Sequence, residues 1–311
     1  MQGRGDLNAM IIQIYEIQTP LEAEKCIELG VDHIGSVVLS LDEWRVPLLK
    51  ETVLLSEGSD IKSSLIPLFH DPDMTYRTLD YYQPDYIHFC DSLTDHDGRP
   101  TDLEKFVKLQ TRLKEKFPDV GIIRSIPIPK NGAASDFPFF EIAGTLQPSS
   151  DIFLTDTWLG KEPVEGYIGI TGETADWAMA QSLVRQSRIP VILAGGLSPD
   201  NVYDSIMEVL PAGADSCTHT NRVVDEGDPV RFQKDFQKVE VFVKEVRRAE
   251  RELYEEKERL TEKLKGLRAD LKDREDALPA HSVRPHQIMV IEALEEDIEA
   301  VKKELERLNM V

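Results

Sequence analysis

The chain has 311 residues, 41% of them hydrophobic, which is enough for one large core and an accessory segment. Asp and Glu outnumber Lys and Arg by 57 to 36, which gives a net charge of −21, and no basic cluster interrupts this excess. Nucleic acids and anionic membrane surfaces are therefore disfavoured as partners. A small phosphorylated or anionic ligand remains compatible with the charge, because backbone amides at a helix start bind phosphate locally.

The start of the chain, residues 1–9, is polar and precedes the first strand-like run. We expect this segment to be disordered, with Met10 as an alternative start. No run of about 18 apolar residues occurs, so we expect neither export nor a membrane span. The three cysteines, Cys26, Cys90 and Cys217, show no paired spacing. Together these features predict a cytoplasmic protein without a disulfide framework.

Up to about residue 240, short apolar runs alternate with helical patterns. The runs occupy residues 11–17, 33–39, 64–69, 85–90, 120–126, 151–155, 190–195 and 214–219. Eight such units match the size of a (β/α)8 barrel. The alternative is an open doubly wound sheet, but the number of units and the lack of a GxGxxG motif after the first run favour closure. The sequence therefore predicts an α/β protein with a TIM barrel over residues 10–240.

Residues 241–311 have a different character, because leucines recur at heptad spacing among Glu, Lys and Arg. The first seam includes Leu260, Leu264, Leu267 and Leu271, and a second seam begins at Ile291. A proline loop at 279–285 separates them, which predicts two helices in an antiparallel coiled-coil hairpin. Such a hairpin buries little surface alone, so we expect it to associate with another copy or a protein partner; a solvated packing arm is the alternative.

Five motifs, in order, resemble those of the phosphoribosylanthranilate isomerase family. They are "LGVDHIGSVV" (29–38), "PDYIHFCD" (84–91), "FLTDT" (153–157), "GITGETADW" (169–177) and "LAGGLSPDNV" (193–202). The resemblance covers about residues 10–235 and leaves out the hairpin. It implies a barrel enzyme of tryptophan biosynthesis, an intramolecular oxidoreductase that performs an Amadori-type aldose–ketose isomerisation of a phosphoribosyl amine. It implies no metal or redox cofactor, and it needs a general acid, a general base and a phosphate anchor.

The resemblance places the acid at Asp156, directly after a buried strand, where partial shielding from water helps a carboxyl keep its proton. The base position departs from the family. Where the family reads like "KICGIT", with cysteine as base, this chain reads "QIYEIQ" (13–18), which puts Tyr15 at the cysteine position. A phenol ionises near pKa 10, so Tyr15 is a poor base unless a cation lowers its pKa. Strand alternation is expected to turn the adjacent Glu16 to the opposite face.

The phosphate end of the family pattern is partly kept. The matching residues are Gly169, Thr171, Gly172, Gly195, Gly196, Thr218 and His219. His219 occupies a glycine position and would crowd a bound phosphate. Arg45 lies one residue out of register with the family's strand-two arginine. The alternative is that these glycines only form tight barrel turns.

Several further polar residues stand at predicted strand ends, among them His88, Cys90 and Arg124. No CxxC or HxxxH spacing accompanies them, so we expect no metal site. They fit a pocket altered for a changed substrate, and the histidines offer replacement bases. We expect either the family isomerisation or a divergent reaction on a small phosphorylated substrate. The alternative is a non-catalytic ligand-binding or assembly module that works through the hairpin.

Overall fold

The computed structural model describes residues 9–132, 136–224, 229–279 and 284–308. The predicted disordered start therefore lies outside the described residues, except for Ala9, and so does most of the predicted proline loop. The chain divides into two compact units, one of Met10–Arg247 and a second that contains the chain from Arg248 onward. The barrel unit thus ends at residue 247, rather than at the expected 240.

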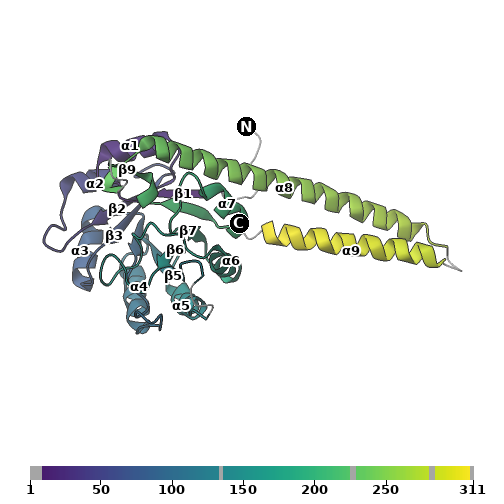
Figure 1. Cartoon of the computed structure of the whole chain (residues 1–311), viewed down its shortest axis with the longest axis horizontal. Coiled ribbons are helices and arrows are strands. Elements are labelled where there is room, and N and C mark those ends of the chain that lie inside the picture. Colours follow the sequence, from purple (N-terminus) through teal and green to yellow (C-terminus); the bar gives the residue numbers. More distant parts are fainter. Residues whose placement is uncertain (1–8, 133–135, 225–228, 280–283, 309–311) are drawn as a thin grey trace. The chain divides into compact units, whose positions relative to one another are not determined.

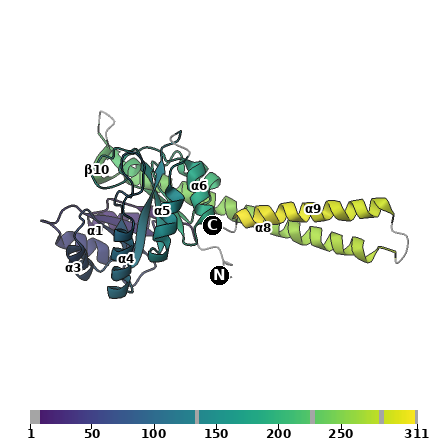
Figure 2. The ribbon, with the colours of Figure 1, turned by 90° about the horizontal axis from the view of Figure 1, so that it is seen from below.

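Strands and helices alternate through the first unit (Figures 1 and 2). The strands are β1 (Ile11–Ile14), β2 (His33–Val38), β3 (Lys62–Pro67), β4 (Tyr86–Phe89), β5 (Gly121–Pro129), β6 (Ile152–Trp158), β7 (Val191–Leu193) and β8 (Gly213–Ser216). The helices between them are α1 (Pro20–Glu28), α2 (Pro47–Leu54), α3 (Pro72–Tyr82), α4 (Glu104–Lys116), α5 (Phe139–Leu146), α6 (Trp177–Gln186) and α7 (Val202–Val209).

The eight strands pair in parallel and in chain order, and β8 pairs with β1 to close the barrel. This confirms the predicted (β/α)8 fold. A short antiparallel pair that the sequence did not predict, β9 (Asn221–Val223) and β10 (Pro229–Lys234), follows β8. The helix α8 (Phe236–Asp276) begins in the barrel unit, where Val239, Phe242 and Val246 are buried.

Aliphatic side chains and one aromatic ring fill the centre of the barrel. The cluster contains Tyr15, Ile123, Ile152, Leu154, Ile192 and Ala194. The ring of Tyr15 lies over Gly35 in β2, where an added Cβ would approach a ring carbon to 2.3 Å. A glycine at position 35 is therefore required for the ring of Tyr15 to enter the barrel.

Three aspartates join neighbouring strands at the amino-terminal end of the barrel. Asp32, Asp85 and Asp151 precede β2, β4 and β6, and their carboxylates accept from the backbone amides of Ile12, Ser63 and Ile122 at 2.8, 2.8 and 2.7 Å. Each also pairs with a cation, namely Arg247, Lys62 and Lys114. At the fourth equivalent place, before β8, the register puts Ala212. A hydrogen bond from a strand amide to an aspartate therefore occurs in β1–β2, β3–β4 and β5–β6, and its equivalent in β7–β8 is absent among the described residues.

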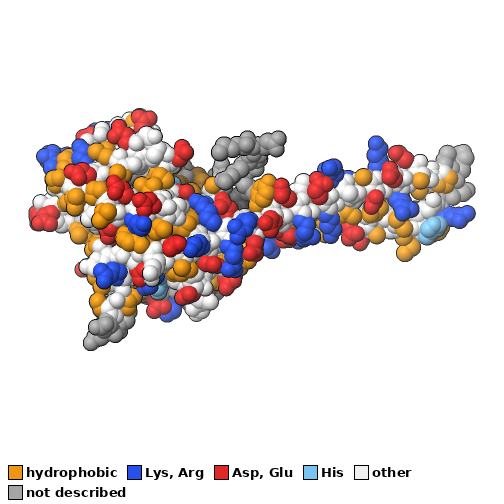
Figure 3. Space-filling view, turned by 90° about the horizontal axis from the view of Figure 1, so that it is seen from above, with side chains coloured by type: hydrophobic (Ala, Val, Ile, Leu, Met, Phe, Trp, Pro, Cys, Tyr) orange, Lys and Arg blue, Asp and Glu red, His pale blue; other side chains and the backbone are white. Residues whose placement is uncertain are grey.

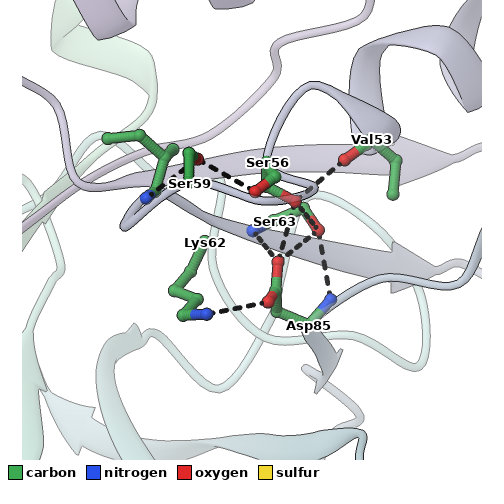
Figure 4. Close-up of polar contacts among 7 residues, drawn as sticks. Val53, Ser56, Ser59, Lys62, Ser63 and Asp85 are labelled. Atoms are coloured by element: carbon green, nitrogen blue, oxygen red, sulfur yellow. Dashed lines mark hydrogen bonds and ion pairs between the residues drawn. The ribbon is translucent and has the colours of Figure 1, made fainter.

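The aspartate before β4 is the most heavily bonded of the three (Figure 4). Besides the amide of Ser63, its carboxylate accepts from the hydroxyls of Ser56 and Ser63 at 2.8 and 2.9 Å. The ammonium of Lys62 donates to its other oxygen at 3.1 Å. Because every partner is a loop or strand residue of this end, the cluster is a structural one that holds β3 against β4.

The second unit contains the remainder of α8 and the helix α9 (Pro285–Leu308), which runs back alongside α8 in both views (Figures 1 and 2). On the face in Figure 3, acidic and basic side chains mix along these helices. Their ion pairs join residues three or four apart on one helix, as in Arg259–Glu256 and Lys302–Glu299. Within the described part of the chain, no helix is both long and apolar enough to cross a membrane.

Candidate active site

A cavity opens at the carboxyl-terminal ends of the barrel strands, where TIM-barrel enzymes place their active sites. Its empty volume is about 780 Å³, part of it open to solvent. The polar and glycine residues on its wall are Tyr15, Glu16, His88, Cys90, Asp156, Thr171, Gly172, Gly195, Gly196, Asp215, Ser216, Cys217, Thr218, His219 and Arg231. Most of the residues chosen from the sequence therefore meet in one cavity.

Asp156, in β6, is the predicted acid, and its environment suits that role. Burial raises the pKa of its carboxyl to about 7, and the nearby Glu162 raises it further, although the amide of Thr157 donates to Oδ1 at 2.9 Å. The carboxyl lies directly over Gly169, where an added Cβ would come within 2.2 Å of Oδ2. Gly169 therefore serves the site by leaving room for the carboxyl and does not itself line the cavity.

A second carboxyl, Asp215 in β8, faces the same cavity. Burial raises its pKa to about 8, and the charge of Asp156 adds to that rise. The side-chain amide of Gln13, which lies beside it on β1, donates to Oδ1 at 3.2 Å. Gln13 stands where the family pattern has lysine, so Asp215 has a neutral neighbour in place of a cation. The cavity therefore holds two carboxyls that both titrate near neutral pH.

Tyr15 follows β1 and points into the barrel, where its phenol meets polar groups from two other strands, β3 and β4. Ser64 donates to the phenol oxygen at 2.9 Å, and Nδ1 of His88 lies 2.6 Å from it. The other ring nitrogen of His88 lies 2.9 Å from Oγ of Ser125. Burial raises the pKa of Tyr15 well above 10, and burial together with the charge of Arg124 lowers the pKa of His88 to about 3. Both groups are therefore neutral near pH 7, and neither is a ready base.

Glu16 corrects one expectation, because it lines the same cavity as Tyr15. Its backbone is left-handed, with φ of 63°, so strand alternation has ended before this residue. Burial raises the pKa of Glu16, but hydrogen bonds from Asn221, Arg231 and the amide of Phe232 outweigh burial and bring the pKa below its usual value. Glu16 is therefore an ionised anchor for the segment that contains β9 and β10.

The glycine turns form one end of the cavity. Gly172 and Gly196 have left-handed backbones, with φ of 66° and 68°. A Cβ on Gly196 would lie 2.6 Å from the backbone of Glu173, so the loop after β7 packs directly on the loop after β6. His219 does not stand free in this space, because its Nε2 lies 2.8 Å from the carbonyl oxygen of Gly172. The two loops thus pack closely against each other on the cavity wall.

Two arginines chosen from the sequence lie away from the cavity. The guanidinium of Arg45 stacks on Trp44, 4.4 Å from the ring centroid. Arg124 is fully buried and donates to Asp91 at 2.8 Å, between the rings of Phe89 and Phe106. Neither side chain lines the cavity, so the expectation that they bind substrate directly is not supported.

A family model and the most similar relatives that were found all name the same isomerase. A family model described as N-(5'phosphoribosyl)anthranilate (PRA) isomerase matches residues 120–218. The N-(5'-phosphoribosyl)anthranilate isomerase of Methanocella arvoryzae is 30% identical over 245 residues, which cover 76% of this chain and 97% of that protein. The chain belongs to this isomerase family. The enzyme of Methanothrix thermoacetophila, 28% identical over 249 residues, covers the same share.

Solved structures of phosphoribosylanthranilate isomerases share the fold. The Pyrococcus furiosus structure covers 77% of this chain and 99% of its own, with a TM-score of 0.53 and 23% identity. Another, in complex with reduced 1-(o-carboxyphenylamino)-1-deoxyribulose 5-phosphate, covers 76% of this chain and 98% of its own, with a TM-score of 0.54 and 17% identity. About a quarter of this chain lies outside the part that these structures cover.

Two cavity residues were missed by sequence reasoning. Asp215 belongs to the run "ADSCTH", which was interpreted as a strand next to the phosphate end, and no role was assigned to its carboxyl. Asp215, Ser216 and Cys217 all line the cavity, so alternation along β8 does not single out Asp215. Arg231 lies in an unpredicted strand and reaches the cavity only through the fold, so no motif points to it.

Proposed function

We propose that this protein isomerises a phosphoribosyl amine, as the names of its relatives describe, with Asp156 as general acid and Asp215 as general base. The observation that carries the proposal is the presence of these two carboxyls in one cavity that ends in glycine turns. Burial raises the pKa of both, and their mutual repulsion favours a state in which one is protonated and the other ionised. Acid–base catalysis across a sugar needs the singly protonated form with the proton on Asp156. Because the pKa of Asp215 is the higher of the two, this form is the less populated of the two singly protonated forms.

In the proposed reaction, amides of the turns at Gly172, Gly195 and Gly196 bind the phosphate. Asp156 gives its proton to the ring oxygen as the C1–O bond breaks, which leaves a C1=N iminium. Asp215 then removes the proton from C2, and a C1=C2 enaminol forms. Protonation of C1 and loss of the C2 hydroxyl proton give the 1-amino-1-deoxyketose, so substrate and product have the same atoms.

Tyr15 takes a different part from the cysteine whose position it occupies. Its phenol is neutral and held by Ser64 and His88, so it forms a wall of the site and contacts the sugar without accepting the C2 proton. The base has in effect moved from the strand β1 to the neighbouring strand β8.

The test is turnover of phosphoribosylanthranilate by the purified full chain, together with growth of a tryptophan auxotroph that lacks the isomerase. We expect Asp156→Asn and Asp215→Asn each to lower kcat by about 10²- to 10⁴-fold, the usual worth of a general acid or base. Asp80→Asn, at an exposed carboxyl on α3 that does not line the cavity, is the matched control. Ligand binding without turnover by the native chain would instead favour a non-catalytic module.

We further propose that the protein is cytoplasmic and that its hairpin mediates self-association. The seam residues Leu264, Leu267, Leu271, Ile291 and Leu294 are only partly buried. A second hairpin would cover them and remove apolar surface from water. We expect Leu267→Glu to reduce the solution mass to that of a monomer, whereas Arg268→Glu, an exposed neighbour, leaves it unchanged. Equal masses for the native chain and the Leu267→Glu variant would contradict this.

A further inference from the structure

The loop that joins β6 to α6 brings a strained turn to the cavity. Its residues on the cavity wall are Ile168, Ile170, Thr171 and Gly172. Gly169, Ile170 and Gly172 have left-handed backbones, with φ of 96°, 61° and 66°. Glycine adopts this conformation readily, whereas a β-branched residue such as isoleucine is strained in it. The turn at Ile170 therefore needs contacts outside itself to keep its shape.

The segment just before this turn is bound to the end of β4. The amide of Ile168 donates to the carbonyl oxygen of Cys90 at 2.8 Å. Tyr167 pairs with Asp91 in an isolated antiparallel bridge. Because Tyr167 directly precedes Ile168, a contact that holds the ring of Tyr167 also holds the start of the turn.

His70, which follows β3, makes such a contact. Its ring stacks on that of Tyr167, with 4.8 Å between the centroids and 5° between the planes. A Cβ on Gly166 would lie 3.3 Å from Nε2 of His70, so this glycine leaves room for the ring. Nδ1 of His70 lies 2.9 Å from Oδ1 of Asp91, whose other oxygen accepts from Arg124 at 2.8 Å. His70 therefore joins the loop to the ion pair of Asp91 and Arg124.

The charge of His70 depends on pH, because its side chain is 56% exposed and exchanges protons with solvent. The titratable groups that face it among the described residues are Asp91 after β4, Lys105 on α4 and Tyr167 in the loop. The hydrogen bond to Asp91 raises the pKa of His70 above the ordinary 6.5, although burial and Lys105 oppose the rise. Burial also raises the pKa of Tyr167, which keeps its phenol neutral.

Asp91 stays ionised over the same pH range. Burial raises the pKa of its carboxyl, but Arg124 and His70 outweigh burial and bring that pKa to about 2. A charged His70 therefore forms an ion pair with Asp91 and a cation–π contact with Tyr167, whereas a neutral His70 keeps only a weaker hydrogen bond and a weaker stack.

We propose that His70 is a positioning residue that holds the loop after β6 in its ligand-binding shape while the imidazole ring is charged, and that the loop loosens when the ring loses its proton. The stabilisation is complete at low pH and is lost as the pH rises through the raised pKa of His70. The strained turn at Ile170 opens most easily, because its own backbone favours another conformation. The effect on ligand binding rests on the proposed function, since the turn lines the same cavity, whereas the effect on the loop does not.

The test follows the loop and the ligand separately on the full chain between about pH 6 and about pH 9. Amide hydrogen exchange of residues 167–172, measured by mass spectrometry, reports on the loop. Titration calorimetry with reduced 1-(o-carboxyphenylamino)-1-deoxyribulose 5-phosphate reports on the cavity. His70→Arg supplies a planar cation at every pH in this range, and His70→Phe supplies a ring that stacks without charge. A comparison of chains at the same pH cancels the titration of the ligand and the intrinsic pH dependence of exchange.

We expect the native chain to behave like His70→Arg near the acidic limit and like His70→Phe near the alkaline limit. Relative to His70→Arg, its exchange at residues 167–172 should rise by about 3- to 10-fold between these limits, and its ligand affinity should fall by about the same factor. His286→Arg, at an exposed histidine in the second unit, is the control and should follow the native chain. Circular dichroism checks that each variant is folded.

The outcomes separate the inference from the proposed function. Equal exchange at residues 167–172 in the native chain, His70→Arg and His70→Phe at every pH would overturn the inference, while the proposed function would stand. Exchange that depends on His70 while ligand affinity does not would also overturn it, because the loop would then not position the ligand. If the native chain does not bind the compound at any pH, the proposed function falls, and the exchange measurement alone decides whether His70 holds the loop.

Discussion

The two sides of the cavity differ in how closely they follow the family. On the side of β6 and β7, the proposed acid Asp156 and the glycine turns stand where the family motifs predict them, and the family model matches residues 120–218. On the side of β1, Gln13, Tyr15 and Glu16 all depart from the family pattern. The proposed phosphate-binding side of the cavity thus keeps the family pattern, and the side at β1, where the family pattern has its base, departs from it. If Asp215 is the base, as proposed, the base has moved to a neighbouring strand while the glycine turns have stayed in place.

The largest expected effect comes from breaking the side that keeps the family pattern. Gly196→Ala puts a Cβ within 2.6 Å of the backbone of Glu173, at a φ of 68° that non-glycine residues avoid. We expect the variant to lose stabilisation by millimolar phosphate in a thermal-shift assay, and to be less stable by about 1–2 kcal/mol or more. Gly144→Ala, where an added Cβ meets nothing within 4 Å, is the control. Normal phosphate stabilisation of Gly196→Ala would refute phosphate binding at these turns.

The side at β1 is tested next by restoring the family's lysine. The active form has Asp156 protonated and Asp215 ionised, and it is the minor singly protonated form because Asp215 has the higher pKa. Activity therefore falls at low pH, where both carboxyls are protonated, and at high pH, where both are ionised. With pKa values raised to about 7 and about 8, we expect a bell-shaped profile centred between pH 7 and 8. Gln13→Lys places a cation beside Asp215 and should move the acidic limb down by about 1–3 pH units.

One result would count against this assignment of the base, namely an acidic limb that stays in place in Gln13→Lys although the variant remains folded and active. Gln18→Lys adds the same charge near β2 without lining the cavity and serves as the control.

The smallest effect is expected at Tyr15. Tyr15→Phe removes the hydroxyl that contacts Ser64 and His88 but leaves the ring over Gly35. If Asp215 is the base, kcat should fall by less than about tenfold, since only a wall contact is lost. A loss of 10²-fold or more, with the fold intact by circular dichroism, would return the base to the β1 position.

The fold was predictable to a large extent, whereas the site was predictable only in part. Eight apolar runs of strand length alternate with helical patterns, and this periodicity depends on local sequence alone. The glycine turns were predictable for a similar reason, because their left-handed backbones restrict the residue type. In contrast, the inward direction of Glu16 depends on its own left-handed backbone after β1. The place of Arg231 on the cavity wall depends on the contact of β10 with Glu16, a residue more than 200 positions earlier in the chain. The pKa of Asp215 depends on burial, which no motif encodes.

A closed barrel has a seam, the place where the first strand must be held against the last part of the chain. Besides the pairing of β1 with β8 that closes the ring, Arg247 of α8 forms an ion pair with Asp32 at 2.8 Å and donates to the carbonyl of Met10 at 2.7 Å. The first part of α8 therefore also stabilises the amino-terminal end of the barrel. A chain that ends at residue 240, where the leucine pattern suggests a boundary, would lack Arg247 and leave Asp32 without its cation. A chain that ends after Arg247 would keep this ion pair.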